Sequence, residues 1–415
     1  MCPERGAGGR NLAQVHSNEG RPRRGSVSAV STTALDVEAV RRRFSSLRGS
    51  FAFLDAPGGT QVPDDVGEAI ACATREAAGN LGAPYATGHA VEAILLRAKA
   101  DGARFLGCGP DEVVFGMNMT TLDFALSRVA ARDFRAGDEI LVTQLDHDGG
   151  VAPWVELAAD KGLVVRTGAA TDDLEVDYAD LERKLGERTR VVAFAWASNA
   201  TGSLADAERI CALAREAGAI SWIDAVHHAA HEPIDVRAIG ADVLFCSPYK
   251  FCGPHLGVAA VRRELAESWR PYKARPSPRE PVARRFETGT LPYELLAGFS
   301  ATIAYLDSIG GIEAARAHER ALGERFLAGL PPNVTLYGPP TMEGRVPTFL
   351  LNIEGVVARD AAHRLAERGI GVWYADNWYC VGLAERLPEE SLRVGFIHYN
   401  TAEEVDRLLG ELAAL

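Results

Sequence analysis

The fold is decided between residues 219 and 250, which read AISWIDAVHHAAHEPIDVRAIGADVLFCSPYK. The segments AISWIDAVH (219–227) and ADVLFCS (241–247) are apolar runs without regular polar alternation. Such runs are typical of strands that are buried on both faces of a sheet. Two residues, Pro248 and Tyr249, separate Lys250 from the second run. The sequence therefore places a cationic side chain at the carboxyl end of a buried strand.

Strand and helix patterns alternate around this stretch. Apolar runs predict further strands in DEVVFG (111–116), EILVTQ (139–144), RVVAFAWASN (190–199) and GVAAVRR (257–263). Helical patterns occupy TTLDFALSRVAAR (120–132), VAPWVELAADKG (151–162) and ADAERICALAREAG (205–218). Because buried strands alternate with helices, we expect an α/β fold with a mostly parallel sheet flanked by helices.

The pattern changes after the long helix ELLAGFSATIAYLDSIGG (294–311), and the remaining chain predicts a smaller α+β unit. Its last helix begins with Thr401 and Glu404 in capping-box spacing. We expect a disordered extension over residues 1–34, because that segment is rich in Gly, Arg and Ser and has no apolar period. The predicted domains are an N-terminal helix (35–50) packing on the small domain, a large domain (51–300) and a small C-terminal domain (301–415).

The composition excludes several classes of function. The net charge of -12 argues against nucleic acid or an anionic membrane as the main partner. No apolar run approaches the ~20 residues that span a bilayer, and residues 1–34 lack the apolar core of a secretory signal. The seven cysteines form no CxxC pair, so neither a metal site nor a disulfide framework is indicated. We expect a cytoplasmic protein without a metal.

Side chains at the ends of other predicted strands indicate a role for Lys250. Ligands of α/β sheets bind outside the carboxyl ends of the strands, and a lysine in a dry pocket has a lowered pKa and can form a Schiff base. Asp224 ends another buried strand, where an acid could hold a pyridinium nitrogen, and Thr120 and Thr121 stand at a helix start suited to a phosphate. A surface lysine, a turn aspartate and an ordinary helix cap are the alternatives for these positions.

His147 and Asn199 add to this set. His147 follows a strand and could stack on a cofactor ring, and Asn199 could donate to a phenolic oxygen. A histidine of the surface or core and a turn-forming asparagine are the alternatives. Because all these residues occur at successive strand ends, the combination favours pyridoxal 5′-phosphate (PLP) as cofactor.

The stretch IDAVHHAAHEPIDVRAIGADVLFCSPYKFCGPHLGV (223–258) resembles the class V aminotransferase superfamily of fold-type I PLP enzymes, in its cysteine-desulfurase-like branch. The resemblance implies a large domain with a seven-stranded sheet and a smaller α+β C-terminal domain. It makes Lys250 the Schiff-base lysine and Asp224 the pyridinium partner. It also implies cofactor contacts from Thr120, Thr121, His147, His227 and Ser247.

Three further segments support the resemblance. RFETGT (285–290) is similar to the segment that reaches the partner subunit's phosphate through Gly289 and Thr290, which implies a homodimer with shared active sites. LRVGFIHYN (392–400) resembles the strand whose arginine, here Arg393, grips the substrate carboxylate. FLDAPGGTQVP (53–63) resembles the N-terminal loop that lines the substrate pocket.

The sequence also departs from the desulfurase pattern. Tyr249 and His227 replace the family's usual histidine and glutamine, and YADNWYCVGLAERL (374–387) lacks the Gly/His/Cys motif of the mobile loop. Cys380 lies in this segment among aromatic residues, so it is either a sulfur acceptor or a buried apolar side chain. The aromatic neighbours would select a larger or different amino acid: Tyr374, Trp378 and Tyr379.

The resemblance implies an enzyme that acts on an amino acid with a free α-carboxylate. We expect cleavage of a C–S bond, as a C–S lyase or a cysteine-desulfurase-like enzyme. Transamination and epimerisation at the α-carbon are the alternative reactions. A non-catalytic PLP-fold binding protein is the remaining alternative, and intact Lys250, Asp224 and Arg393 argue against it.

Overall fold

The computed structural model describes residues 35–274, 279–375 and 379–415. A seven-stranded sheet has the order β2-β8-β7-β6-β5-β3-β4, and β8 runs antiparallel to its two neighbours while the other strands run parallel. This confirms the predicted α/β fold with a mostly parallel sheet. The disordered extension predicted over residues 1–34 lies outside the described residues.

The strands of this sheet are short, and the helices between them are of varied length. The strands are β2 (Val113–Gly116), β3 (Glu139–Thr143), β4 (Val164–Gly168), β5 (Thr189–Ala195), β6 (Ile220–Asp224), β7 (Val243–Cys246) and β8 (Gly257–Val261). The helices of residues 35–308 are α1 (Val37–Arg41), α2 (Asp64–Glu76), α3 (Ala86–Leu106), α4 (Met119–Ala130), α5 (Asp148–Lys161), α6 (Tyr178–Lys184), α7 (Ala207–Glu216), α8 (Arg263–Ser268) and α9 (Tyr293–Ser308).

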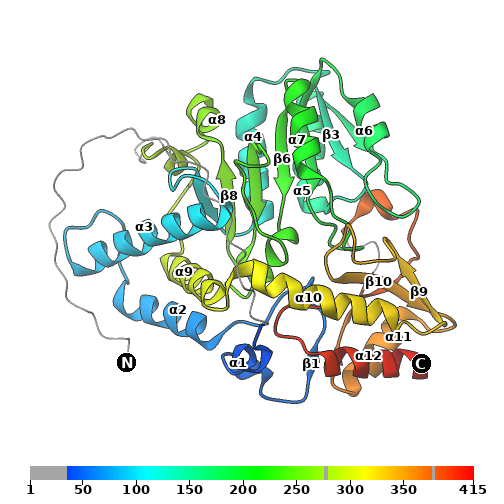
Figure 1. Ribbon diagram of the computed structural model, residues 1–415. Helices are drawn as coiled ribbons and strands as arrows, with labels where there is room; N and C mark the ends of the chain where they lie inside the picture. The colour runs from blue at the N-terminus through cyan, green and yellow to red at the C-terminus, as the bar shows by residue number, and fades with distance from the viewer. Residues whose placement is uncertain (1–34, 275–278, 376–378) are drawn as a thin grey trace, which may run out of the picture. The chain divides into compact units, whose positions relative to one another are not determined.

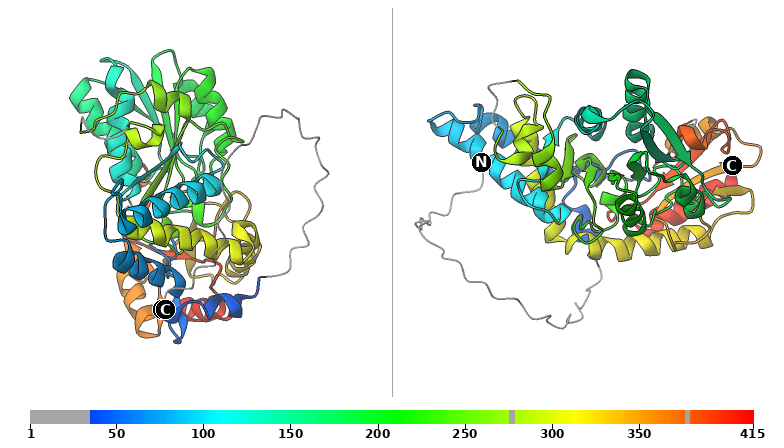
Figure 2. Two further views of the ribbon diagram at one scale, coloured as in Figure 1. Left: turned by 90° about the vertical axis from the view of Figure 1, so that its left-hand side faces the viewer. Right: turned by 90° about the horizontal axis from the view of Figure 1, so that it is seen from above.

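Both faces of the sheet are buried, as the apolar runs predicted. Successive side chains of a strand point to opposite faces, so Leu244 belongs to one core cluster and Phe245 to the other. Ile223 and Trp222 divide between the same two clusters. Helices α3, α7 and α9 contribute to the first cluster and α4, α5 and α8 to the second, so that helices cover both faces (Figure 1, Figure 2). Functional side chains are therefore confined to the strand ends.

The C-terminal residues form a second, antiparallel sheet of order β12-β13-β10-β9. Its strands are β9 (Val334–Tyr337), β10 (Thr348–Ile353), β12 (Trp373–Ala375) and β13 (Ser391–Gly395), and its core is shared with α10 (Gly311–Ala328), α11 (Ala358–Glu367) and α12 (Ala402–Ala414). A separate parallel pair joins β1 (Ala52–Phe53) to β11 (Ile370–Gly371). The capping box predicted for the last helix is confirmed, with Glu404 N 3.2 Å from Thr401 Oγ1.

Helix α1 is tied to this C-terminal part. Nη1 of Arg41 donates to the carbonyl of Tyr399 at 2.8 Å and lies 2.9 Å from a carboxylate oxygen of Glu404. Residues 35–415 group as one compact unit. A division of that unit into a large and a small domain near residue 300 stays a prediction.

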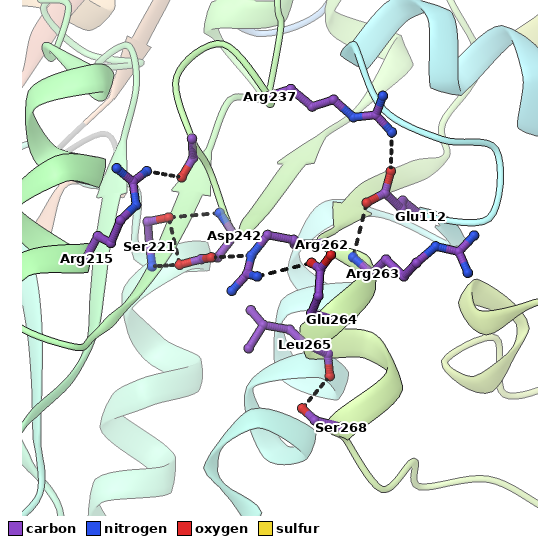
Figure 3. Close-up of polar contacts among 11 residues, drawn as sticks. Glu112, Arg215, Ser221, Arg237, Asp242, Arg262, Arg263, Glu264, Leu265 and Ser268 are labelled. Atoms are coloured by element: carbon purple, nitrogen blue, oxygen red, sulfur yellow. Dashed lines mark hydrogen bonds and ion pairs between the residues drawn. The ribbon is translucent and has the colours of Figure 1, made fainter. Parts of the chain in front are cut away.

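Polar contacts fix the strands at the sheet end where β6 and β7 begin (Figure 3). A carboxylate oxygen of Asp242 accepts from the backbone N–H of Ser221 at 2.9 Å, and the other accepts from Nε of Arg262 at 2.8 Å. Glu112 accepts from the N–H of Arg263 at 3.1 Å and from Arg237 at 3.1 Å. Because the starts of β6 and β7 are held in register, the position of Asp224 at the end of β6 and that of Lys250 after the end of β7 are also fixed.

The outer edge of β2 is closed by a buried ion pair. Oε1 of Glu287 accepts from the N–H of Phe115 at 3.1 Å and binds Nζ of Lys99, which also donates to the carbonyl of Val113 at 2.5 Å. Both charged side chains are buried, and a buried charge is stable only when it is paired. Glu287 immediately precedes the RFETGT residues Thr288 to Thr290, so it holds the start of that segment against the sheet.

In the part of the chain that the structure describes, no single helix combines the length and apolar composition needed to cross a membrane. The pair α9 and α10 passes by length and composition when the two are taken together, with a bend of 67° between them. Free thiols among the described residues are those of Cys108, Cys211, Cys246, Cys252 and Cys380.

Gly257 generates the first prediction. A Cβ added there would lie 2.4 Å from the backbone carbon of Asn118, the residue that caps α4. Backbone atoms cannot rotate away, so Gly257→Ala should lower the free energy of unfolding by about 1–3 kcal/mol. Urea unfolding of the purified variant measures the loss. Gly186→Ala is the control, because a Cβ at Gly186 meets nothing within 4 Å; an equal effect in both variants would contradict this packing.

Candidate active site

A cavity of about 490 Å³ lies at the carboxyl ends of the sheet strands. The ends of β5, β6 and β7 supply one part of its wall, and β12, β13 and the loop at Pro57 and Gly58 supply another. Eight of the predicted site residues line it: Thr120, His147, Asn199, Asp224, His227, Ser247, Lys250 and Arg393. The structure thus brings together residues that are spread over more than half of the sequence.

Lys250 ends a short 3-10 helix (Pro248–Lys250) that follows β7. Its side chain is only 9% exposed, and Nζ donates to the carbonyl of Pro57. Burial, followed by the positive charge of Arg393, lowers the pKa of Lys250 to about 7, although the carboxylates of Asp55 and Asp224 oppose the shift. A substantial fraction of the amine is therefore neutral and nucleophilic near neutral pH.

Asp224 is the last residue of β6. Its Oδ1 accepts from the N–H of Val226 at 2.8 Å. This hydrogen bond fixes the carboxyl group at the end of the strand, where Asp224 lines the cavity. Burial raises the pKa of Asp224 to about 6, and the Val226 hydrogen bond and the Lys250 charge oppose this rise. Near neutral pH the group is mostly ionised and can hold a protonated ring nitrogen.

The N-terminus of α4 opens into the cavity. Asn118 caps the helix by accepting from the N–H of Thr121 at 2.8 Å, and the N–H of Met119 donates to Oγ of Ser247 at 3.3 Å. Thr120 lines the cavity, as predicted. Thr121 is exposed and its hydroxyl donates to the carbonyl of Asn118 at 3.1 Å, so it does not line the cavity. Successive residues of a helix point about 100° apart, and only one of the two threonines can face inward.

His147 caps helix α5, and its Nδ1 accepts from the N–H of Gly149 at 2.9 Å. Burial, together with the charges of Lys250 and Arg393, lowers the pKa of His147 to about 4. The imidazole is therefore neutral. Its ring stacks on that of Tyr379, with centroids 5.3 Å apart and planes inclined by 18°.

Arg393 lies in the middle of β13 with its side chain buried. Nη1 donates to the backbone carbonyl of Asn199 at 3.1 Å, and Nη2 lies 3.3 Å from Oδ1 of Asp55. His227 lies at the same cavity, where its Nε2 is 2.8 Å from Oγ1 of Thr348, and burial lowers the pKa of its imidazole well below the ordinary value. The guanidinium of Arg393 is thus positioned by Asp55 in the N-terminal loop and by Asn199 in the loop after β5.

Besides Thr121, four predicted residues do not line the cavity. Gly289 and Thr290 are exposed, and Tyr374 packs near His363 on the C-terminal core. Because side chains alternate along a strand, Trp373 faces the cavity in place of Tyr374. Cys380 is buried with Sγ 3.0 Å from Oδ1 of Asn199. Trp378 lies outside the described residues.

Sequence reasoning missed two buried acids beside Asp224. Asp123 is 0% exposed, and its Oδ1 accepts from Nε1 of Trp222 at 3.0 Å. Burial raises the pKa of Asp123 well above its ordinary value, and the charge of Asp224 adds to the rise. Asp146 accepts from the N–H of Ala195 at 2.7 Å, and burial raises its pKa to about 7. Asp123 lies within the predicted helix 120–132, where nothing in the apolar pattern distinguished it from a surface acid.

Comparisons with known proteins complete the assignment. The family described as class-V aminotransferases matches residues 52–408. The chain belongs to the class V aminotransferase family. A probable cysteine desulfurase 2 of Mycobacterium leprae is 33% identical over 93% of this chain and 98% of its own length. An aminotransferase-like protein FGM3 of Gibberella zeae is 29% identical, covering 92% and 98%.

Solved structures agree with this class V aminotransferase assignment. The apo cysteine desulfurase of Thermococcus onnurineus NA1 has a TM-score of 0.86 at 25% identity, covering 92% of this chain and 98% of that one. The cysteine desulfurase CsdA of Escherichia coli has a TM-score of 0.83 at 24% identity and covers 92% and 98%, which shows the shared fold. The chain is therefore a PLP-dependent enzyme of fold-type I.

The cavity of this member of the class V aminotransferase family fits PLP. Lys250 offers a partly neutral amine, Asp224 an acid, and α4 a helix N-terminus with Thr120 and Ser247 beside it, which suits a phosphate. A side chain at Gly149 would fill this space, because an added Cβ would lie 2.9 Å from both Oγ1 of Thr120 and Nδ1 of His147. The donor set therefore matches the cofactor's aldehyde, ring nitrogen and phosphate in kind.

The pKa of Lys250 generates the second prediction. Only the neutral amine attacks an aldehyde, so covalent attachment of PLP to the apoprotein should rise with pH through a midpoint of about 7. The fraction of cofactor that borohydride fixes to the protein at each pH measures attachment, and Lys250→Arg is the control that should fix none. A midpoint near 10.5, the ordinary value, would contradict the burial argument.

The third prediction concerns Asp123. In the folded protein it keeps its proton above the ordinary pKa of 3.8, whereas the unfolded chain releases it, so wild-type stability falls as pH rises above that value. Asp123→Asn removes this titration and still accepts from Trp222. The variant's stability relative to wild type should therefore increase as pH rises above about 4, as measured by urea unfolding. Exposed Asp173→Asn is the control; a pH-independent difference for Asp123→Asn would contradict the assignment.

Proposed function

We propose that this class V aminotransferase family member cleaves the C–S bond of a sulfur-containing amino acid. The observation that carries the proposal is the pair formed by a partly neutral lysine, Lys250, and a buried arginine, Arg393, at one cavity. An amine and a guanidinium so placed suit an amino acid with a free carboxylate. The names of the Mycobacterium and Thermococcus relatives support sulfur chemistry.

Each residue has a role in this proposal. Arg393 binds the substrate carboxylate through charge-assisted hydrogen bonds, and its attachment to Asp55 and Asn199 keeps it in place before substrate arrives. Lys250 removes the proton at the α-carbon, because a base works best with a pKa near the working pH. PLP, when bound, supplies the aldehyde that links to the amino group and the ring that accepts the electron pair.

His147 and Asp224 complete the set around the ring. Neutral His147 offers a flat apolar face without competing for protons, since its pKa is lowered to about 4. Asp224 keeps a negative charge where a protonated ring nitrogen would lie. His227, Ser247, Asn199 and Thr120 are proposed as the polar contacts to the phenolic oxygen and the phosphate.

Cys380 decides between the two forms of C–S cleavage. A desulfurase needs an accessible thiolate to take the sulfur, but Cys380 is buried and its Sγ donates to Oδ1 of Asn199. Burial raises the pKa of Cys380 to about 12, so the group is a thiol at neutral pH. These contacts favour a C–S lyase, which needs no sulfur acceptor.

Two further properties, the homodimer with shared active sites and the cytoplasmic location, are also proposals. Gly289 and Thr290 are exposed at the end of a segment that Glu287 anchors, and in a homodimer with shared active sites they would bind the partner subunit's phosphate. A cytoplasmic location stays the expectation drawn from the sequence.

The fourth prediction tests the reaction. Cys380→Ser should retain activity within about twofold and release pyruvate and ammonia from S-methyl-L-cysteine, because the thiol takes no part in elimination. Lys250→Ala is the control and should lose at least about 10²-fold, the scale of a general base. Loss of L-cysteine turnover in Cys380→Ser, with alanine and a persulfide on Cys380 formed from L-cysteine by the wild type, would favour a desulfurase. A keto acid that retains the sulfur would favour transamination, and racemised substrate an epimerase.

A further inference from the structure

An aromatic wall stands next to the proposed carboxylate site. Strands β12 and β13 pair with Trp373 directly opposite Arg393, so the two side chains share one face of the sheet. The guanidinium carbon of Arg393 lies 5.6 Å from the centre of the indole ring. A substrate held by Arg393 therefore lies beside this indole.

The indole of Trp373 is fixed by its packing against the N-terminal loop. A Cβ added at Gly58 would lie 2.8 Å from a ring carbon of Trp373 and 2.0 Å from Oδ2 of Asp55. Only glycine at position 58 therefore allows the N-terminal loop to lie this close to the indole of Trp373. Trp373 nevertheless remains 50% exposed while it lines the cavity, which leaves apolar surface available to a ligand.

Tyr379 supplies a second aromatic side chain at the cavity. Its backbone carbonyl accepts from the N–H of Asp148 at 2.6 Å, and its ring stacks on His147 while the side chain stays 70% exposed. Small residues, Ala197 and Ala375, complete this part of the lining. The polar groups Lys250 and Asp224 belong to the sheet side of the cavity, so the apolar part is left for the substrate's side chain.

We propose that Trp373 and Tyr379 form a subsite for the substituent on sulfur, and that the preferred substrates are S-substituted L-cysteines with an apolar or aromatic substituent. This inference rests on the proposed C–S cleavage. Among the described residues that line the cavity there is no cysteine to accept bare sulfur, which agrees with a sulfur that departs together with its substituent.

The reaction balances without an oxidant or reductant. The α-proton is removed, the C–S electron pair leaves with sulfur, and the departing thiolate takes up a proton to give the thiol R–SH. Water then hydrolyses the remaining three-carbon unit to pyruvate and ammonia. The products of one S-substituted cysteine and one water are therefore one thiol, one pyruvate and one ammonia.

The test uses the holoenzyme with S-benzyl-L-cysteine and L-cysteine as probes. Wild-type kcat/KM should be at least about tenfold higher for S-benzyl-L-cysteine, the range that an apolar pocket contributes. Trp373→Ala should reduce this ratio by about tenfold or more, and Tyr379→Ala should reduce it in the same direction. Tyr85→Ala is the matched control, because Tyr85 is an exposed aromatic that does not line the cavity.

A binding measurement separates this inference from the proposed reaction. L-phenylalanine and L-alanine have no sulfur to lose, so their dissociation constants can be measured from the absorbance of bound cofactor without turnover. The wild type should bind L-phenylalanine more tightly by about tenfold, and Trp373→Ala should abolish the difference. C–S cleavage with no preference in either measurement overturns the subsite, as does an equal effect of Trp373→Ala on both ligands. Selective binding without cleavage of any sulfur substrate supports the subsite and overturns the proposed reaction instead.

Discussion

The active site depends on one desolvated amine, that of Lys250. Lys250 follows the buried strand β7, and its amine is removed from water. This burial destabilises the ammonium form and lowers the pKa of Lys250 to about 7. The carbonyl of Pro57 and the acids Asp55 and Asp224 offset part of that cost. Without burial the amine would be fully charged at neutral pH, and without the acids a lysine would not remain buried at this position.

Asp55 connects this amine to the rest of the site. Its carboxylate contacts Arg393 on β13 and lies close enough to Lys250 to raise that group's pKa. The N-terminal loop therefore links the carboxyl ends of the large sheet with the C-terminal strands. In the proposed function this one acid would couple cofactor chemistry at Lys250 to substrate recognition at Arg393, since any movement of the loop changes the surroundings of both cations.

The sequence predicted the buried strands well because their apolar runs reflect burial on both faces. It missed β4, an edge strand in which Val164 is 41% exposed and Arg166 interrupts the apolar pattern. Lys250 and Asp224 could be found because strand ends meet at one edge of a sheet. Arg393 lies in the middle of β13 and was predicted only from the resemblance of the segment 392–400. The sequence could not predict which of two adjacent side chains faces the cavity. It predicted Thr121 together with the inward-facing Thr120, and it predicted Tyr374 instead of the inward-facing Trp373.

The ion pair at β2 also protects the protein from self-association. An uncovered edge strand exposes backbone N–H and C=O groups that can recruit a strand from another molecule and begin aggregation. At β2 the Glu287 carboxylate accepts from the N–H of Phe115, and Nζ of Lys99 donates to the carbonyl of Val113. At the opposite edge, β4, Arg166 pairs with Glu139 and keeps charge beside the strand. Hydrogen bonds thus cover one edge of the sheet that lines the cavity, and charged side chains oppose strand pairing at the other edge.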